Sequence, residues 1–113
     1  MKTNIYHMRP SVSRDFPNYG TQTEKQEWVR ANRIDGYIKV AELTIDSQNL
    51  DVAYQATQNG LDEQYPSWIA LACAYEGNTT FVSLSTRSTM VGDIIHQNNK
   101  DYLVDNAGFL EIK

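Results

Sequence analysis

Apolar and polar residues alternate along several short segments of the chain, a pattern that is typical of β-strands. The first such segment is residues 3–8, which ends at Arg9-Pro10 because proline has no backbone N–H to donate. Residues 37–45 alternate less regularly but are rich in β-forming side chains. We therefore expect two strands in the first half of the chain.

The strand pattern continues from residue 79 to the end of the chain. The expected strands are residues 80–84, 93–97, 100–105 and 109–112. Asn98-Asn99 is a turn pair that tolerates positive φ, and Asn106-Ala107-Gly108 is a second turn signal. These patterns predict that residues 79–112 form an antiparallel meander or a partly open barrel.

Helical spacing is clearest in the middle of the chain. Four residues fall on one helical stripe: Leu50, Ala53, Tyr54 and Thr57. Together with an N-cap signal at Asp46-Ser47, this stripe predicts one main helix over about residues 48–58. A shorter helix is expected over about residues 24–32, where Thr23 and Gln26 have the spacing of a capping box.

The remaining segments complete the expected organisation. Residues 10–23 contain two prolines, a glycine and several small polar residues, which predicts a long loop. The apolar run Trp68–Tyr75 fits either a buried strand or a buried helical turn. A chain of 113 residues has room for a single domain, residues 1–113, and mixed helices and strands place it in the α+β class.

Composition limits the classes of site and the cellular compartment that fit the protein. Cys73 is the single cysteine, which excludes an internal disulfide and a cysteine-rich zinc site. The longest apolar run is far shorter than a membrane span, and residues 1–7 contain no apolar stretch typical of a secretory signal. We therefore expect a cytoplasmic protein of the host cell, in which the sequon at Asn78 stays unmodified.

Acidic residues are concentrated in the second half of the chain. Residues 61–113 carry seven acidic and three basic residues, and the net charge of the whole chain is −4. An acidic half suits a basic partner or a solvated surface, whereas nucleic-acid binding needs a basic stripe. The alternative, nucleic-acid binding, would need a local basic face. Six cations of the first half could form it: Arg9, Arg14, Lys25, Arg30, Arg33 and Lys39.

Catalytic and metal-binding patterns are weak in this sequence. His7 and His96, the two histidines, are far apart in the chain and lack the spacing of a metal motif. Cys73 has no local signature of a nucleophile, and the six glycines are isolated rather than gathered in a phosphate-binding loop. We expect no catalytic residues, no metal and no cofactor, and hence a protein that is not an enzyme.

Three aromatic residues are candidates for contact with a partner. Trp28 lies between charged residues on the expected short helix, and Phe16 and Tyr19 lie in the expected long loop. Tryptophan and tyrosine often anchor protein interfaces, although an aromatic side chain in a loop can also pack back on its own domain.

Residues 86–95, with the sequence TRSTMVGDII, resemble the "RSTSVGDV" segment of small uncharacterised proteins from phages, plasmids and other mobile elements, the YodL-like domain group. Three further segments are similar to that group in the same order: residues 50–59, 66–68 and 102–112, the last ending in GFLEI. Met90 stands where the group has serine, and Gln58 is inserted before Asn59. The resemblance implies the fold of the group and an origin in a mobile element, and the group has no established activity.

The motif also has a physical interpretation. Gly92 supplies freedom in φ for a tight turn, and Asp93 can accept hydrogen bonds from backbone N–H groups. Ser88 and Thr89 carry hydroxyls that can cap the same turn. Arg87 is expected to pair with a carboxylate such as Asp93 or Glu111, or to contact an external anion. These five motif residues complete the set of candidate binding residues.

Together, the sequence favours a non-enzymatic accessory protein of a phage or mobile element that binds a host or element-encoded protein. The alternative is a β-rich module that binds nucleic acid by stacking bases on exposed aromatic rings.

Overall fold

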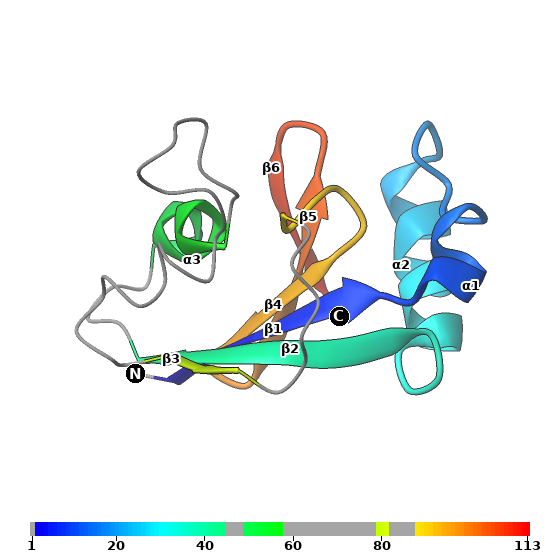
Figure 1. Cartoon of the computed structure of the whole chain (residues 1–113). Helices are drawn as coiled ribbons and strands as arrows, with labels where there is room; N and C mark the ends of the chain where they lie inside the picture. The colour runs from blue at the N-terminus through cyan, green and yellow to red at the C-terminus, as the bar shows by residue number, and fades with distance from the viewer. Residues whose placement is uncertain (1, 45–48, 58–78, 82–87) are drawn as a thin grey trace, which may run out of the picture.

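The computed structural model contains a sheet of six antiparallel strands with helices on both faces (Figure 1). It describes residues 2–44, 49–57, 79–81 and 88–113. The strands are β1 (Lys2–Met8), β2 (Tyr37–Thr44), β3 (Thr79–Phe81), β4 (Ile94–Gln97), β5 (Lys100–Asp105) and β6 (Gly108–Ile112). The helices are α1 (Pro10–Ser13), α2 (Gln22–Asn32) and α3 (Leu50–Ala56). The expected α+β class is therefore confirmed.

The strand order is β3-β2-β1-β4-β5-β6, with β3 and β6 at the two edges of an open sheet among the described residues. Strands β4, β5 and β6 form the expected meander, and Asn98 and Asn99 have φ of 56° and 60° in its first turn. The prediction of one meander over residues 79–112 is wrong for β3, which pairs with β2 at the opposite edge. A short strand carries no local signal of its partner, so its pairing depends on the rest of the sheet.

Two expected boundaries in the first half are corrected. The expected loop of residues 10–23 contains the short helix α1, because Pro10 fits the first position of a helix, where no backbone donor is needed. The expected helix of residues 24–32 begins earlier, at Gln22, because the capping box is formed by Thr21 and Glu24 rather than by Thr23 and Gln26. In that box the Thr21 hydroxyl accepts from the Glu24 N–H, and the Glu24 carboxylate accepts from the Thr21 N–H.

The main expected helix of residues 48–58 is observed as α3, Leu50–Ala56, and its N-cap is Asn49 rather than Asp46-Ser47. The Asn49 side chain accepts a hydrogen bond from the Asp51 N–H over 3.0 Å. The ends of the expected helix, the apolar run 68–75 with Cys73, Asn78 of the sequon, residues 82–84 and Arg87 lie outside the described residues.

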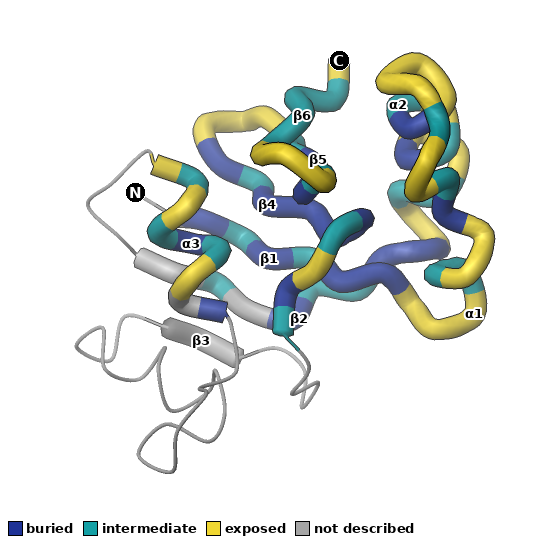
Figure 2. Tube along the Cα trace, turned by 90° about the horizontal axis from the view of Figure 1, so that it is seen from above, coloured by how far each residue is buried: buried dark blue, intermediate teal, exposed yellow. Residues whose placement is uncertain are grey.

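The core is divided between the two faces of the sheet. Successive strand residues point to opposite faces, so Ile95 and Val104 pack in one cluster while their neighbours Ile94 and Leu103 pack in the other. The first cluster includes Ala53 of α3. The second includes aromatic and aliphatic residues from α2 and from the segment before it. Figures 1 and 2 show α3 and the α1–α2 pair near opposite ends of the strands.

A glycine beside the second cluster allows a close approach of two segments. Gly92 has φ of +98°, a conformation that other residues adopt at a cost, and a Cβ placed there would displace the end of the Met8 side chain, which is buried in the core. Gly108 has φ of +108° but has open space around a Cβ. The two glycines therefore share a positive φ, and they differ in the free space around an added Cβ.

We predict that Gly92→Ala destabilises the protein by more than about 2 kcal/mol, since it adds a steric clash to a strained φ. Gly108→Ala serves as the control and should cost about 1 kcal/mol, the strain alone. Urea denaturation followed by circular dichroism measures both values. Equal losses in the two variants would contradict the argument.

Candidate functional site

The motif segment, residues 88–93, is held inside the protein by its aspartate. Asp93 is fully buried, and its Oδ1 accepts a hydrogen bond from the Met8 N–H over 2.8 Å. Its Oδ2 accepts another from the Met90 N–H over 2.8 Å. One carboxylate thus joins the end of β1 to the turn that precedes β4. Asp93 forms the backbone hydrogen bonds that its position in the motif predicts, and its burial prevents direct contact with a partner.

Thr89 connects the same segment to α3. Its backbone N–H donates to the carbonyl of Thr57, just after α3, over 3.0 Å. Its hydroxyl lies 3.0 Å from Nε2 of His7, and both side chains are almost fully buried. Nε2 of His7 also lies 3.8 Å from Oδ2 of Asp93. Thr89 therefore links the motif segment to the end of α3 through its backbone and to β1 through its hydroxyl, whereas the capping of the turn by this hydroxyl stays a prediction.

Gly92 adds contacts to β2 and β5. Its carbonyl accepts a hydrogen bond of 2.6 Å from the Tyr37 hydroxyl, and its N–H donates to the Val104 carbonyl over 2.9 Å. Burial, together with the nearby charge of Asp93, raises the pKa of Tyr37 well above its ordinary value, so the phenol stays protonated as a donor. Ser88, at the start of the segment, is half-buried.

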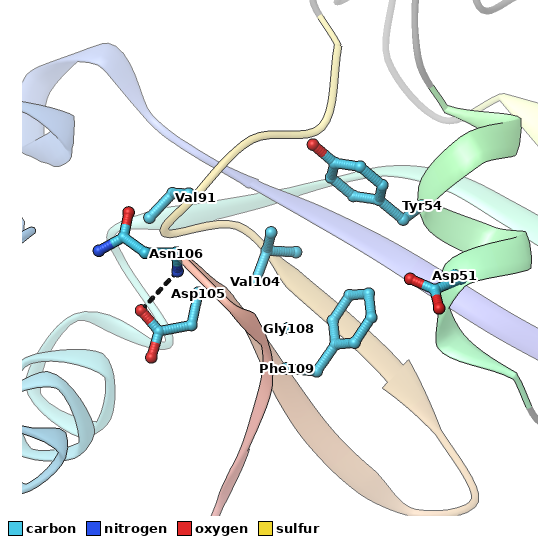
Figure 3. Close-up of a pocket in the computed structure, with 8 residues that line it drawn as sticks. All are labelled: Asp51, Tyr54, Val91, Val104, Asp105, Asn106, Gly108 and Phe109. Carbon is cyan, nitrogen blue, oxygen red and sulfur yellow. Dashed lines mark hydrogen bonds between the residues drawn. The ribbon is translucent and has the colours of Figure 1, made fainter.

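The motif segment also borders a surface hollow of about 240 Å³ between α3 and the β5–β6 hairpin. Eight of the described residues line it: Asp51, Tyr54, Val91, Val104, Asp105, Asn106, Gly108 and Phe109. Figure 3 shows Asp51 and Tyr54 projecting from α3 toward the hairpin, with Val104 and Phe109 facing them. The rings of Tyr54 and Phe109 lie 6.3 Å apart at 73°, an edge-to-face arrangement. We call this feature the α3–hairpin hollow.

The hairpin turn beside the hollow is fixed to the α2 side of the molecule. Asp105 accepts a hydrogen bond of 2.7 Å from Nζ of Lys25, and the Asn106 side chain donates to the carbonyl of Asn18 over 3.0 Å. Tyr19, the residue after Asn18 in the chain, is fully exposed. Burial acts to raise the pKa of Asp105, but the hydrogen bonds from Lys25 and from the Asn106 backbone outweigh it, so the pKa is lowered.

The other two aromatic candidates pack within the domain. Phe16 is buried, and its ring meets Trp28 edge-on with centroids 5.2 Å apart. Trp28 is half-buried and also contacts the ring of Tyr37 at 6.2 Å. Both belong to the core on the α2 face, so their rings stabilise the fold. Tyr19 is the candidate of this group that faces solvent.

Four cations of the described residues are neutralised by carboxylates. The pairs are Lys25 with Asp105, Arg33 with Asp101, Lys39 with Glu42 and Lys100 with Glu111. Arg33 also stacks over the ring of Tyr6, 4.0 Å from its centroid. Burial acts to raise the pKa of Asp101, but hydrogen bonds from Arg33 and His96 outweigh it, so the pKa is lowered. The basic face proposed as the alternative is therefore partly cancelled by local acids.

His7 and His96 do not come together, because His7 contacts Thr89 while His96 lies 2.7 Å from Asp101 on the other face of the sheet. Within the described ranges, no group of three or more histidine, cysteine or acidic side chains is placed to hold a metal ion. In the same part of the chain, no helix is long and apolar enough to cross a membrane.

Comparison of the chain with protein-family models, with curated proteins and with solved structures gave no match.

Sequence reasoning did not identify the hollow. Tyr54 was assigned to the core stripe of a helix, and Phe109 to a terminal strand. The available signals were the pairing of a carboxylate and an aromatic residue three positions apart in α3, Asp51 and Tyr54, and an aromatic residue directly after a turn glycine. Neither signal shows that these residues meet.

We predict that Asp93→Ala lowers the free energy of unfolding by about 2–4 kcal/mol, because two buried N–H groups lose a charged acceptor. Asp93→Asn should cost less, since the amide keeps one acceptor oxygen. The exposed Asp35→Ala is the control, with an expected change within about 0.5 kcal/mol. Urea denaturation measures all three. Unchanged stability of Asp93→Ala, with loss of partner binding, would instead make the motif a binding site.

We also predict that the Arg33–Asp101 pair gives an acid-sensitive contribution to stability. The folded pKa of Asp101 is lowered, so its contribution is present above the unfolded pKa and is lost as pH falls through the folded pKa. Arg33→Gln should therefore lose less stability than the wild type between pH about 6 and about 3. Thermal melts across this range test it, with the exposed Arg14→Gln as the control. Parallel pH profiles for the wild type and Arg33→Gln would refute it.

Proposed function

We propose that the protein is a non-enzymatic accessory protein of a phage or mobile element, and that it acts by binding a host or element-encoded protein through the α3–hairpin hollow. The observation that carries the proposal is an open hollow lined by the aromatic pair Tyr54 and Phe109. Aromatic side chains supply large contact areas at protein interfaces and are enriched among their energetic hot spots.

The position of the hollow supports a docking role. Its walls come from a helix and a hairpin, and the hairpin turn is fixed by the bonds of Asp105 and Asn106 to the α2 side. A surface held in place before binding loses less conformational entropy when a partner docks. The resemblance of residues 86–95 to proteins of mobile elements supports the biological setting.

The charge distribution favours a protein partner over nucleic acid. Of the six cations that the basic face would contain, Lys25, Arg33 and Lys39 are ion-paired. The Arg30 guanidinium donates to the carbonyl of Lys113 and to the Gln26 side chain. Non-specific DNA binding depends on clustered cations that release counterions from phosphates. Cations already held by protein groups contribute less to such binding.

We predict that affinity capture from a host-cell lysate recovers a partner with the wild-type chain and loses it with Asp51→Lys, because this change reverses a charge on the rim of the hollow. Glu27→Lys is the matched control: it makes the same change in net charge at an exposed position of α2, away from the hollow. It should recover the same partner, as identified by mass spectrometry. Circular dichroism of each variant confirms folding.

Recovery of the same proteins by all three chains would count against the proposal. Binding of random duplex DNA by the wild-type chain at about 0.15 M salt, lost on charge reversal of Arg30 and Arg33, would favour the nucleic-acid alternative. Fluorescence anisotropy with a labelled duplex measures it, and we expect no binding.

A further inference from the structure

The two carboxylates that line the hollow differ in what they contact. Asp105 is ion-paired with Lys25 over 2.7 Å and also accepts from the Asn106 N–H over 2.8 Å. Asp51 is exposed and takes part in no ion pair with the described residues. The hollow therefore has a negative charge on its α3 rim that the described part of the protein does not neutralise.

The rings beside Asp51 add a second attraction for positive charge. Tyr54 lies three residues after Asp51 in α3, so both side chains are on one face of the helix. Phe109 faces them from the hairpin, with its ring at 73° to that of Tyr54 (Figure 3). Aromatic faces attract cations within about 6 Å of the ring centroid, and the effect increases as water is excluded.

The size of the hollow limits its occupant. A volume of about 240 Å³ is smaller than the roughly 300–1,000 Å³ of pockets that bind drug-sized ligands and cofactors. It suits a single long side chain. Val91 and Val104 give the hollow an apolar part, which fits a hydrocarbon stem better than a compact ion.

We infer that the hollow takes one lysine or arginine side chain of the partner protein, with its stem against the valines and its cationic head between Asp51 and the two rings. This inference rests on the proposed function, since it names the chemistry of the occupant of the same site. An acidic side chain would be repelled by Asp51. A purely apolar side chain would form no ion pair with the Asp51 carboxylate, so this charge would not contribute to its affinity.

The inference is tested by titrating the ¹⁵N-labelled full chain with the capped peptide Gly-Ser-Lys-Ser-Gly and with its neutral analogue, in which norleucine replaces lysine. We expect the lysine peptide to shift the amide signals of Tyr54, Asn106 and Phe109, and to bind at least about fivefold more tightly than the analogue. Asp51→Asn should reduce this preference to less than about twofold, while Glu27→Gln preserves it.

A second variant tests the rings separately from the charge. Phe109→Leu keeps an apolar side chain in the core but removes the aromatic face, so it should weaken the lysine peptide more than the norleucine peptide. The amide spectrum of each variant shows whether it is folded. Cadaverine, a free amine of similar chemistry, is the third probe and should bind more weakly than the lysine peptide.

Equal affinity for the two peptides, an unchanged preference in Asp51→Asn, shifts away from the hollow, or no shifts at all would each overturn the inference. Cadaverine binding as tightly as the peptide would also overturn it, by assigning the hollow to a free amine. These outcomes are separable from failure of the proposed function. If capture still depends on Asp51 while the peptides fail, only the cationic occupant is wrong; if capture does not depend on Asp51, the docking site itself is wrong.

Discussion

The buried carboxylate of Asp93 is the interaction on which the other contacts of the domain depend. It accepts hydrogen bonds from the N–H groups of Met8 and Met90, and its own backbone pairs with Val104. These bonds bring the end of β1 and the turn before β4 together, and place that turn against β5. A charge removed from water needs such donors, because burial without them would cost several kcal/mol, on the order of the whole stability of a small domain.

The hollow is a consequence of this arrangement. Gly92 and Asp93 are bonded to the backbone of Val104, so the neighbouring Val91 lines the hollow together with Val104. The N–H of Thr89 joins the same segment to Thr57 at the end of α3. The motif therefore acts on the proposed docking surface indirectly: its buried residues position the walls, and side chains from other parts of the chain supply the chemistry. The ion pairs on the α2 side also influence the choice of partner, since they neutralise cations that would otherwise attract phosphate groups.

Much of the fold could be predicted where the signal is local. The turn at Asn98 and Asn99 has the positive φ values that its residue types favour, and it joins strands that are adjacent in sequence. The start of α2 was placed two residues too late because Thr21 and Thr23 offer competing caps. The local residue types allow either threonine to cap the helix. The observed cap is Thr21, where the reciprocal bonds are completed by Glu24, whose negative charge is also favoured at the N-terminus of a helix over the neutral amide of Gln26.

By itself, the sequence determined the class of fold, the β4–β6 meander and the hydrogen bonding of Asp93 to nearby backbone, because alternation, turn residues and a carboxylate beside a turn glycine act over a few residues. Only the tertiary structure decided that β3 pairs with β2 and that Tyr54 meets Phe109 across the hollow. The tertiary structure also determined that Phe16 is buried in the core while Tyr19 is exposed, although both residues lie in one segment. The physical reason is that contacts between distant segments depend on how the two faces of the sheet are packed, and no local pattern of residues records that packing.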